Sequence, residues 1–158
     1  MKENAKNYIV SIVIALAVGG LSALLTMGNM DLYSEITRPP LSPPSILFPI
    51  VWTVLYTLMG ISAAMIYGER NAKPAEVNRA LIVYGLNLFL NFFWSIIFFN
   101  MRAYLFAFVW LVALWAVILI MIVKYYRIKP IAGILQIPYI LWVTFAGYLN
   151  FAIFLLNK

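Results

Sequence analysis

Long apolar windows constrain this chain more than any other feature of its sequence. Each window holds about 20 residues, the length that an α-helix needs to cross ~30 Å of hydrocarbon. None of them shows the long two-residue alternation expected of outer-membrane strands. The sequence therefore predicts an all-α integral membrane protein. We expect a single transmembrane domain over residues 1–158, a bundle of five helices at about residues 8–27, 46–67, 80–99, 103–123 and 131–155.

The composition supports this class and excludes several kinds of site. Hydrophobic residues make up 65% of the chain and charged residues 10%, against about 25% charged residues in an average soluble domain. Because the chain has no cysteine and no histidine, disulfides, Cys or His metal sites and haem ligation by these residues are excluded. The net charge of +6 comes from basic residues between the windows, so it indicates membrane topology and not nucleic-acid binding.

The basic residues also predict the orientation. Eight of the eleven lysines and arginines fall on the side of the N-terminus, and three fall on the opposite side. The positive-inside rule therefore places the N-terminus in the cytoplasm and the C-terminus outside the cell membrane. A secretory signal peptide is the alternative for the first window, but its apolar run of 19 residues exceeds the ~7–15 of a signal peptide. We keep it as a helix.

The segment from Tyr84 to Asn100, YGLNLFLNFFWSIIFFN, is apolar enough for lipid and yet carries amides. Helical spacing places Asn87, Asn91 and Trp94 on one face. Since an uncompensated amide in hydrocarbon costs several kcal/mol, both asparagines should face protein, water or a ligand. Two interpretations of Asn91 stay open, an interhelical hydrogen bond worth about 0.6 kcal/mol and a ligand contact.

The connection between the first two windows, GNMDLYSEITRPPLSPPS, is the only long one. Its prolines fix backbone angles and favour extended chain, so we expect it to be stiff. It is either a plain connector or an outer lid over a cavity, because long ordered loops in compact chains are often functional. The second connection, GERNAKPAEVN, is typical of a solvated turn.

Small and aromatic residues follow helical stripes. Trp52, Tyr56 and Met59 share one stripe of the second window. Small residues at four-residue spacing permit close helix contact, within the bundle or between protomers, and packing within the bundle is the simpler interpretation. Such residues are Gly60 and Ala64 in the second window and Ala15, Gly19 and Ala23 in the first.

Depth along the helices indicates a shared cavity. With a rise of ~1.5 Å per residue, several polar and aromatic residues lie about 7–13 Å from the outer boundary, and Trp142 lies nearer the midplane. Those residues are Trp52, Asn91, Trp94 and Asn150. They could line one cavity beneath the proline-rich connection. An interfacial belt is the alternative for tryptophans near helix ends, although Trp142 and Trp115 are too deep for it.

Three motifs are specific enough to indicate a family. They read FPIVWTVLYTLMG, LNFFWSIIFF and PYILWVTFAGYLN, and the loop RPPLSPP precedes them. With these motifs the chain resembles the TspO/MBR family, the tryptophan-rich sensory proteins related to the translocator protein or peripheral-type benzodiazepine receptor, and especially its bacterial members. The resemblance implies a homodimer in the lipid membrane, with an outer lid and a pocket for porphyrins, haem precursors and isoquinoline carboxamides. Some bacterial members are reported to degrade protoporphyrin IX in light and oxygen.

Matching the motifs position by position carries the family's pocket over to this chain. The resemblance implies Trp52 and Trp142 as candidate catalytic residues. It implies ligand contacts at Tyr33, Trp52, Asn91, Trp94, Trp142, Ala146 and Leu149.

Some positions depart from the family's pattern. Leu32, Leu41 and Ile46 stand where relatives often have tryptophan, and Asn87 stands where they have glutamine. The end of the chain lacks the tyrosine of the vertebrate cholesterol-recognition pattern, and VKYYR at Val123 fits only the loose form of that pattern. These departures bear on the ligand contacts of the lid more than on the fold.

Two function classes follow. The first is a tetrapyrrole-binding protein that promotes light- and oxygen-dependent porphyrin degradation. With no His, no Cys and no carboxylate inside a helix core, acid–base or nucleophilic catalysis is not expected, whereas a bound porphyrin brings its own photochemistry and needs no further cofactor. The second class is a carrier of porphyrins, lipids or sterols. Against it stands the expectation that the helices lack the buried charges and unwound segments that transporters place at mid-membrane.

Overall fold

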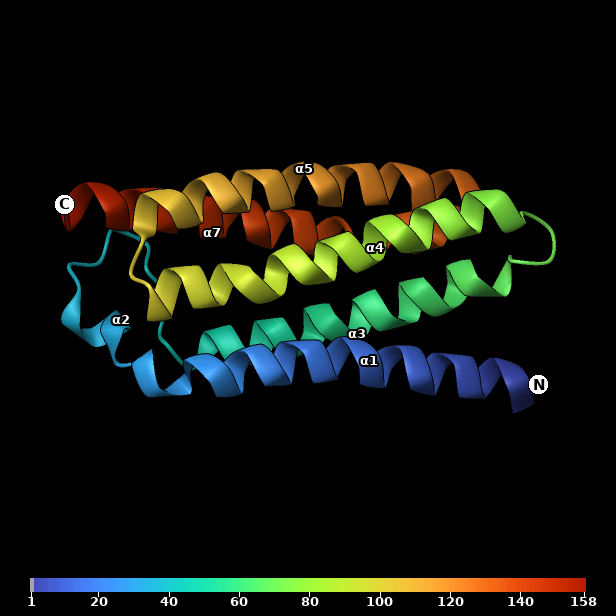
Figure 1. The fold of residues 1–158 in the computed structure, drawn as a ribbon, viewed down its shortest axis with the longest axis horizontal. Coiled ribbons are helices and arrows are strands. Elements are labelled where there is room, and N and C mark those ends of the chain that lie inside the picture. Colours follow the sequence, from blue (N-terminus) through green and yellow to red (C-terminus); the bar gives the residue numbers. More distant parts are fainter. Residues whose placement is uncertain (1) are drawn as a thin grey trace.

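The computed structural model describes residues 2–158, and helices make up most of them. Five helical spans are long and apolar enough to cross a membrane. Figure 1 shows the long helices side by side with roughly parallel axes. They are α1 (Lys2–Thr26), α3 (Leu47–Gly68), α4 (Pro74–Ser95), α5 (Tyr104–Ile128) and α7 (Ile137–Leu156), and no strand occurs among residues 2–158. The predicted all-α membrane bundle is confirmed.

The two ends of the bundle differ in what they carry. The N-terminus and the α3–α4 turn lie at one end, and the C-terminus lies at the other with the segment that joins α1 to α3 (Figure 1). We call this segment, residues 27–46, the first connection. It contains η1 (Met27–Asn29) and α2 (Leu32–Glu35), and the remaining short helical segments are η2 (Ile96–Asn100) and α6 (Pro130–Ile134).

Two helices begin earlier than the hydropathy windows predicted. α1 starts at Lys2 and α4 at Pro74. Proline is well suited to the first turn of a helix, where its missing N–H has no partner to lose and its fixed φ is already helical. Hydropathy marks only the part of a helix that lies in hydrocarbon, so the polar first turns were left outside the predicted ranges.

The fifth predicted helix is wrong in one respect, because the structure divides it. α6 and α7 are separated by a turn at residues 135–136. Pro138 has no N–H to donate to the carbonyl four residues earlier, so the helical ladder is interrupted. The buried Gln136 side chain donates to a backbone oxygen of α3 at 3.2 Å and to Ser62 Oγ at 2.7 Å. This turn lies near the N-terminal end of the predicted range 131–155 and keeps right-handed helical backbone angles, so it does not contradict the expectation that the helices lack unwound segments at mid-membrane.

α1 packs against α3 through small residues that the sequence singled out. Ala15 is fully buried, and Gly19 lies so close to the Tyr56 ring that a Cβ atom there would collide with it. A Cβ atom at Gly60 would lie 2.5 Å from a backbone carbon of α1. Ala23, in contrast, is exposed. Packing within the bundle is thus confirmed for Ala15, Gly19 and Gly60.

We predict that Gly60→Ala lowers the free energy of unfolding by about 1–3 kcal/mol, the usual cost of overpacking, because the added methyl group meets backbone that cannot rotate away. Gly20→Ala is the matched control, since a Cβ atom there meets nothing within 4 Å. The control should gain up to about 1 kcal/mol from helix propensity. Thermal unfolding midpoints in one detergent measure both, and equal midpoints would contradict the close contact.

Candidate functional site

A buried hydrogen-bond network joins three helices in the middle of the bundle. The hydroxyl of Tyr139 on α7 donates to Asn87 Oδ1 at 2.7 Å and accepts from Asn91 Nδ2 at 2.7 Å. The hydroxyl of Tyr56 on α3 donates to Asn91 Oδ1 at 3.1 Å. Tyr139, Asn87 and Asn91 are 1%, 0% and 2% exposed. Both asparagines therefore face protein and not lipid, as predicted, and Asn91 makes the interhelical bonds that one of its two interpretations required.

Trp52 packs against the two tyrosines of this network. Its ring centroid lies 5.6 Å from that of Tyr56 and 6.3 Å from that of Tyr139. Such spacings are those of favourable aromatic pairs. Because hydrogen bonds hold both tyrosine rings, the Trp52 indole rests against fixed neighbours.

Trp142 belongs to a second aromatic group, which faces the first connection. Its ring centroid lies 5.9 Å from that of Phe48 and 5.6 Å from that of Phe145. Phe48 in turn lies 5.3 Å from the ring of Tyr33. The indole nitrogen Nε1 of Trp142 is buried and has no hydrogen-bond partner. A buried donor without a partner is uncommon and marks a place where a ligand or water can accept.

Trp94 is directed to a different partner from the asparagines of its stripe. Its Nε1 donates to Asn150 Oδ1 at 3.1 Å, and Asn150 Nδ2 donates to the backbone oxygen of Tyr104 at 2.8 Å. Its ring stacks on Phe98 with centroids 5.4 Å apart. Trp94 and Asn150 thus fix the ends of α4, α5 and α7 to one another. In this conformation their polar atoms are occupied.

Ala146 and Leu149 occupy the same face of α7 as Trp142. They are 7% and 5% exposed, and Ala146 is part of the main core. The implied ligand residues are therefore brought together as two neighbouring groups, one around Trp52 and the polar network and one around Trp142 and Tyr33, with Trp94 at a third place. None of them lines the groove of about 340 Å³ between α5 and α7.

The first connection is attached to the bundle by several hydrogen bonds. Tyr148 Oη of α7 donates to the backbone oxygen of Pro40 at 2.9 Å, whereas the bond from Tyr33 Oη to the backbone oxygen of Pro43, at 3.0 Å, lies within the connection itself. The side chain of Asn157 accepts from the Thr37 N–H at 2.9 Å and donates to the Thr37 oxygen at 3.0 Å. The connection is therefore ordered against α7, as a lid would be.

Charge is absent from the described interior and present at both ends. Arg102 pairs with Glu35 at 3.5 Å at the end of the bundle that carries the first connection. Lys129 pairs with Glu69 at 3.1 Å at the opposite end of the bundle. Within residues 2–158 no three His, Cys, Asp or Glu side chains gather as a metal site would require. The site can therefore offer stacking surfaces, hydroxyls, amides and the buried indole N–H of Trp142.

Sequence reasoning missed several residues of this site. Tyr139 and Phe48 lie inside the quoted motifs, three residues before Trp142 and four before Trp52. Helical spacing could have placed each on the stripe of its tryptophan. Tyr148 and Asn157 left no such signal, because their partners are backbone atoms of the connection.

The chain is similar to one protein family and to several named proteins. The sequence model described as the TspO/MBR family matches residues 11–156. The tryptophan-rich protein TspO of Chlorobaculum tepidum is 39% identical over 125 residues, 79% of this chain and 78% of that protein. The tryptophan-rich protein TspO of Archaeoglobus fulgidus is 35% identical over 156 residues, 98% of this chain and 99% of that protein. The translocator protein of Bos taurus is 31% identical over 134 residues, 84% of this chain and 79% of that protein.

We predict that Tyr139→Phe destabilises the bundle by about 1–3 kcal/mol, because it leaves a buried donor and a buried acceptor unpaired. Tyr125→Phe is the matched control, since the hydroxyl of Tyr125 is equally buried and has no partner to lose. Its removal should be neutral or stabilising. Unfolding midpoints of the two variants in the same detergent decide between these outcomes, and a stable Tyr139→Phe variant would contradict the role of the network.

Proposed function

The chain belongs to the TspO/MBR family, and from this premise we propose that it binds tetrapyrroles, namely protoporphyrin IX and related haem precursors, in the membrane. The observation that carries the proposal is the indole N–H of Trp142. It is buried beside the rings of Phe48 and Phe145 and has no hydrogen-bond partner. A planar apolar ring that stacks on such side chains gains about 0.5–1.5 kcal/mol per pair. Isoquinoline carboxamides combine flat rings with a carbonyl acceptor, so we expect them to bind here too.

Entry of such a ligand requires the first connection to move. A ligand pocket of ordinary size has a volume of about 300–1,000 Å³, whereas the rings of Tyr33, Phe48 and Trp142 touch in sequence beneath the connection. Withdrawal of Tyr33 with the connection would open the space in front of the free N–H of Trp142. The connection would therefore act as a lid.

Degradation of the bound pigment would not need a conventional acid–base site. The light-excited porphyrin and oxygen supply the reactivity, while this chain holds the ring, excludes water and presents oxidisable indoles. The Trp52 ring lies against hydrogen-bonded tyrosines, and the Trp142 ring lies against the phenylalanines Phe48 and Phe145. We propose these two indoles as the residues that take part in the photochemistry.

A carrier is the second candidate function. One structural feature favours it that the sequence had not indicated. The turn at residues 135–136 interrupts a membrane span, and the Oε1 atom of Gln136 is buried there without a partner. Transporters place interrupted helices at their substrate sites, and one relative carries the name translocator protein. Porphyrin uptake into sealed proteoliposomes would separate a carrier from a binding protein that modifies its ligand.

We predict that the N-terminus and the α3–α4 turn are cytoplasmic and that the first connection and the C-terminus lie outside, because eight of eleven basic residues fall on the N-terminal side. The chain has no cysteine, so single cysteines can be introduced at the exposed positions Ser34 and Ala72. An impermeant maleimide should label Ser34→Cys on intact cells and Ala72→Cys only after lysis. Labelling of Ala72→Cys alone on intact cells would reverse the orientation.

We predict that the purified protein binds protoporphyrin IX with quenching of its tryptophan fluorescence and alters the pigment under light and oxygen. Replacing Trp52 and Trp142 together with phenylalanine keeps most of the stacking surface, so affinity should stay within about tenfold. Loss of the oxidisable indoles should slow pigment degradation strongly. Absorbance and mass spectrometry of the pigment measure both effects.

Two controls belong to this experiment. Trp110→Phe removes one tryptophan whose Nε1 bonds a backbone oxygen of α4 outside both aromatic groups, so degradation should continue at the wild-type rate. An unrelated tryptophan-containing membrane protein in matched micelles corrects for bleaching of the free pigment. If pigment loss in that sample equals the loss with this chain, the chain binds porphyrin but has no photochemical activity. Absence of binding would refute the proposed function.

A further inference from the structure

Arg38 lies in the first connection, at the outer edge of the aromatic group around Trp142. Its guanidinium carbon is 5.2 Å from the ring centroid of Tyr33. The ring of Tyr33 lies 5.3 Å from that of Phe48, which lies 5.9 Å from that of Trp142. A positive charge therefore stands at one end of a row of rings, and the buried indole N–H of Trp142 stands at the other end.

The backbone on both sides of Arg38 is attached to α7. The side chain of Asn157 bonds the N–H and the oxygen of Thr37 at 2.9 and 3.0 Å. Tyr148 Oη donates to the backbone oxygen of Pro40 at 2.9 Å. Since Arg38 stands between two anchored residues, its backbone is held against α7, while its side chain is exposed at the edge of the aromatic group.

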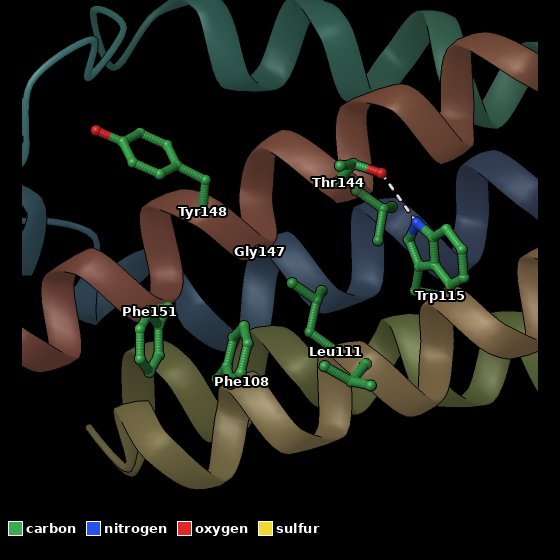
Figure 2. A pocket seen from close by; sticks show the side chains of 9 residues that line it. Phe108, Leu111, Trp115, Thr144, Gly147, Tyr148 and Phe151 are labelled. Atoms are coloured by element: carbon green, nitrogen blue, oxygen red, sulfur yellow. Dashed lines mark hydrogen bonds between the residues drawn. The ribbon is translucent and has the colours of Figure 1, made fainter.

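Tyr148 anchors the connection on the side of α7 that carries the aromatic group. Its ring centroid lies 6.2 Å from that of Phe145, which lies 5.6 Å from that of Trp142. Figure 2 shows Tyr148 and Phe151 directed to opposite sides of α7, with Phe151 beside the groove between α5 and α7. None of the nine residues that line this groove is charged. The groove therefore offers nothing to an anionic ligand, in contrast to the side of α7 where Arg38 lies.

No carboxylate within residues 2–158 pairs with Arg38. The two ion pairs of that range join Arg102 to Glu35 and Lys129 to Glu69. A contact between a cation and an aromatic ring leaves the positive charge in place. The guanidinium group of Arg38 is therefore available to an anion.

The carboxylates of a tetrapyrrole need such a partner. A flat ring held by the aromatic group lies among uncharged side chains, where a carboxylate would lose its water without gaining a cation. At the outer end of the row the carboxylate meets Arg38 instead. Guanidinium groups fit carboxylates better than ammonium groups do, because two parallel N–H donors match the two oxygens.

From this arrangement we propose that Arg38 binds a propionate carboxylate of the tetrapyrrole and orients the pigment, with its carboxylate edge at the first connection and its apolar edge toward Trp142. The inference rests on the proposed tetrapyrrole binding and adds the residue that determines its specificity. The protein then prefers porphyrins with free carboxylates to their esters, which have the same flat ring and no charge. Isoquinoline carboxamides, which have no carboxylate, bind without help from Arg38.

Protoporphyrin IX and its dimethyl ester form a matched pair of ligands for the test. Both are titrated into phosphatidylcholine nanodiscs that hold the full chain, with empty nanodiscs as the reference for partition into lipid, and tryptophan quenching gives the affinities. The free acid should bind about 5-fold more tightly or better, which corresponds to the strongest exposed ion pairs. Added salt should weaken this preference, because the ion pair lies at the surface, and should leave the affinity for the ester unchanged.

Arg38→Gln should lower the affinity for the free acid to that for the ester, while the affinities for the ester and for an isoquinoline carboxamide stay unchanged. Arg38→Lys keeps the charge without the two parallel donors and should retain part of the preference. Lys158→Gln is the matched control, because it removes the same charge at the same end of the bundle (Figure 1) and lies in neither ion pair. Its preference for the free acid should equal that of the wild type.

Three results would overturn the inference. Equal affinities of the wild type for the acid and the ester would show that no cation of the chain recognises the carboxylates. Equal weakening of all three ligands in Arg38→Gln would show that this side chain only supports the fold of the connection. Loss of the preference in Lys158→Gln would place the carboxylate at the end of the chain. If the wild type binds neither porphyrin, the proposed function itself is refuted, so the two kinds of failure are distinguishable.

Discussion

In hydrocarbon, polar groups must find their partners within the protein, and three helices of this bundle meet that demand at the hydroxyl of Tyr139. This hydroxyl uses its donor and one acceptor position at once, and the Asn91 amide passes the connection on to Tyr56. Removing one partner of such a hydrogen bond costs more free energy than the bond itself contributes, because the other polar group stays buried without a partner. The register of α3, α4 and α7 is thereby fixed without a charged residue in the network.

The network also distinguishes the two tryptophans of the proposed site. Trp52 rests on tyrosines whose hydroxyls are both bonded, so its position follows from the polar core. The ring neighbours of Trp142, Phe48 and Phe145, carry no hydroxyl, and Phe48 also lies against Tyr33 of the first connection. A change in the connection therefore reaches Trp142 before it reaches Trp52. A ligand contact by Asn91 would have to replace a bond already made to Tyr56 or Tyr139, so this residue acts on the site mainly through those rings.

The predictable part of this structure is the part set by local pattern. Hydropathy predicted the spans, and four-residue spacing of small side chains predicted the contact of Gly19 and Gly60 with the neighbouring helix. The burial of Asn87 and Asn91 followed from the cost of an amide in lipid. Their partners could not be predicted, because the pairing with Tyr139 depends on how far α4 and α7 are displaced along each other. The turn at Gln136 was not predicted, because a hydropathy average over a window does not register a single proline, which removes one backbone hydrogen bond.

α7 carries each of the features that the proposed activity would need to coordinate. Tyr139 joins it to the polar core, Trp142 faces the aromatic group, and Tyr148 and Asn157 hold the first connection. The turn at residues 135–136 separates it from α6. Opening of the connection must break bonds made by Tyr148 and Asn157, near the C-terminal end of α7, whereas the bonds of Tyr139 near the opposite end can stay intact. This separation of contacts along one helix would allow the proposed opening of the connection while the core keeps its register.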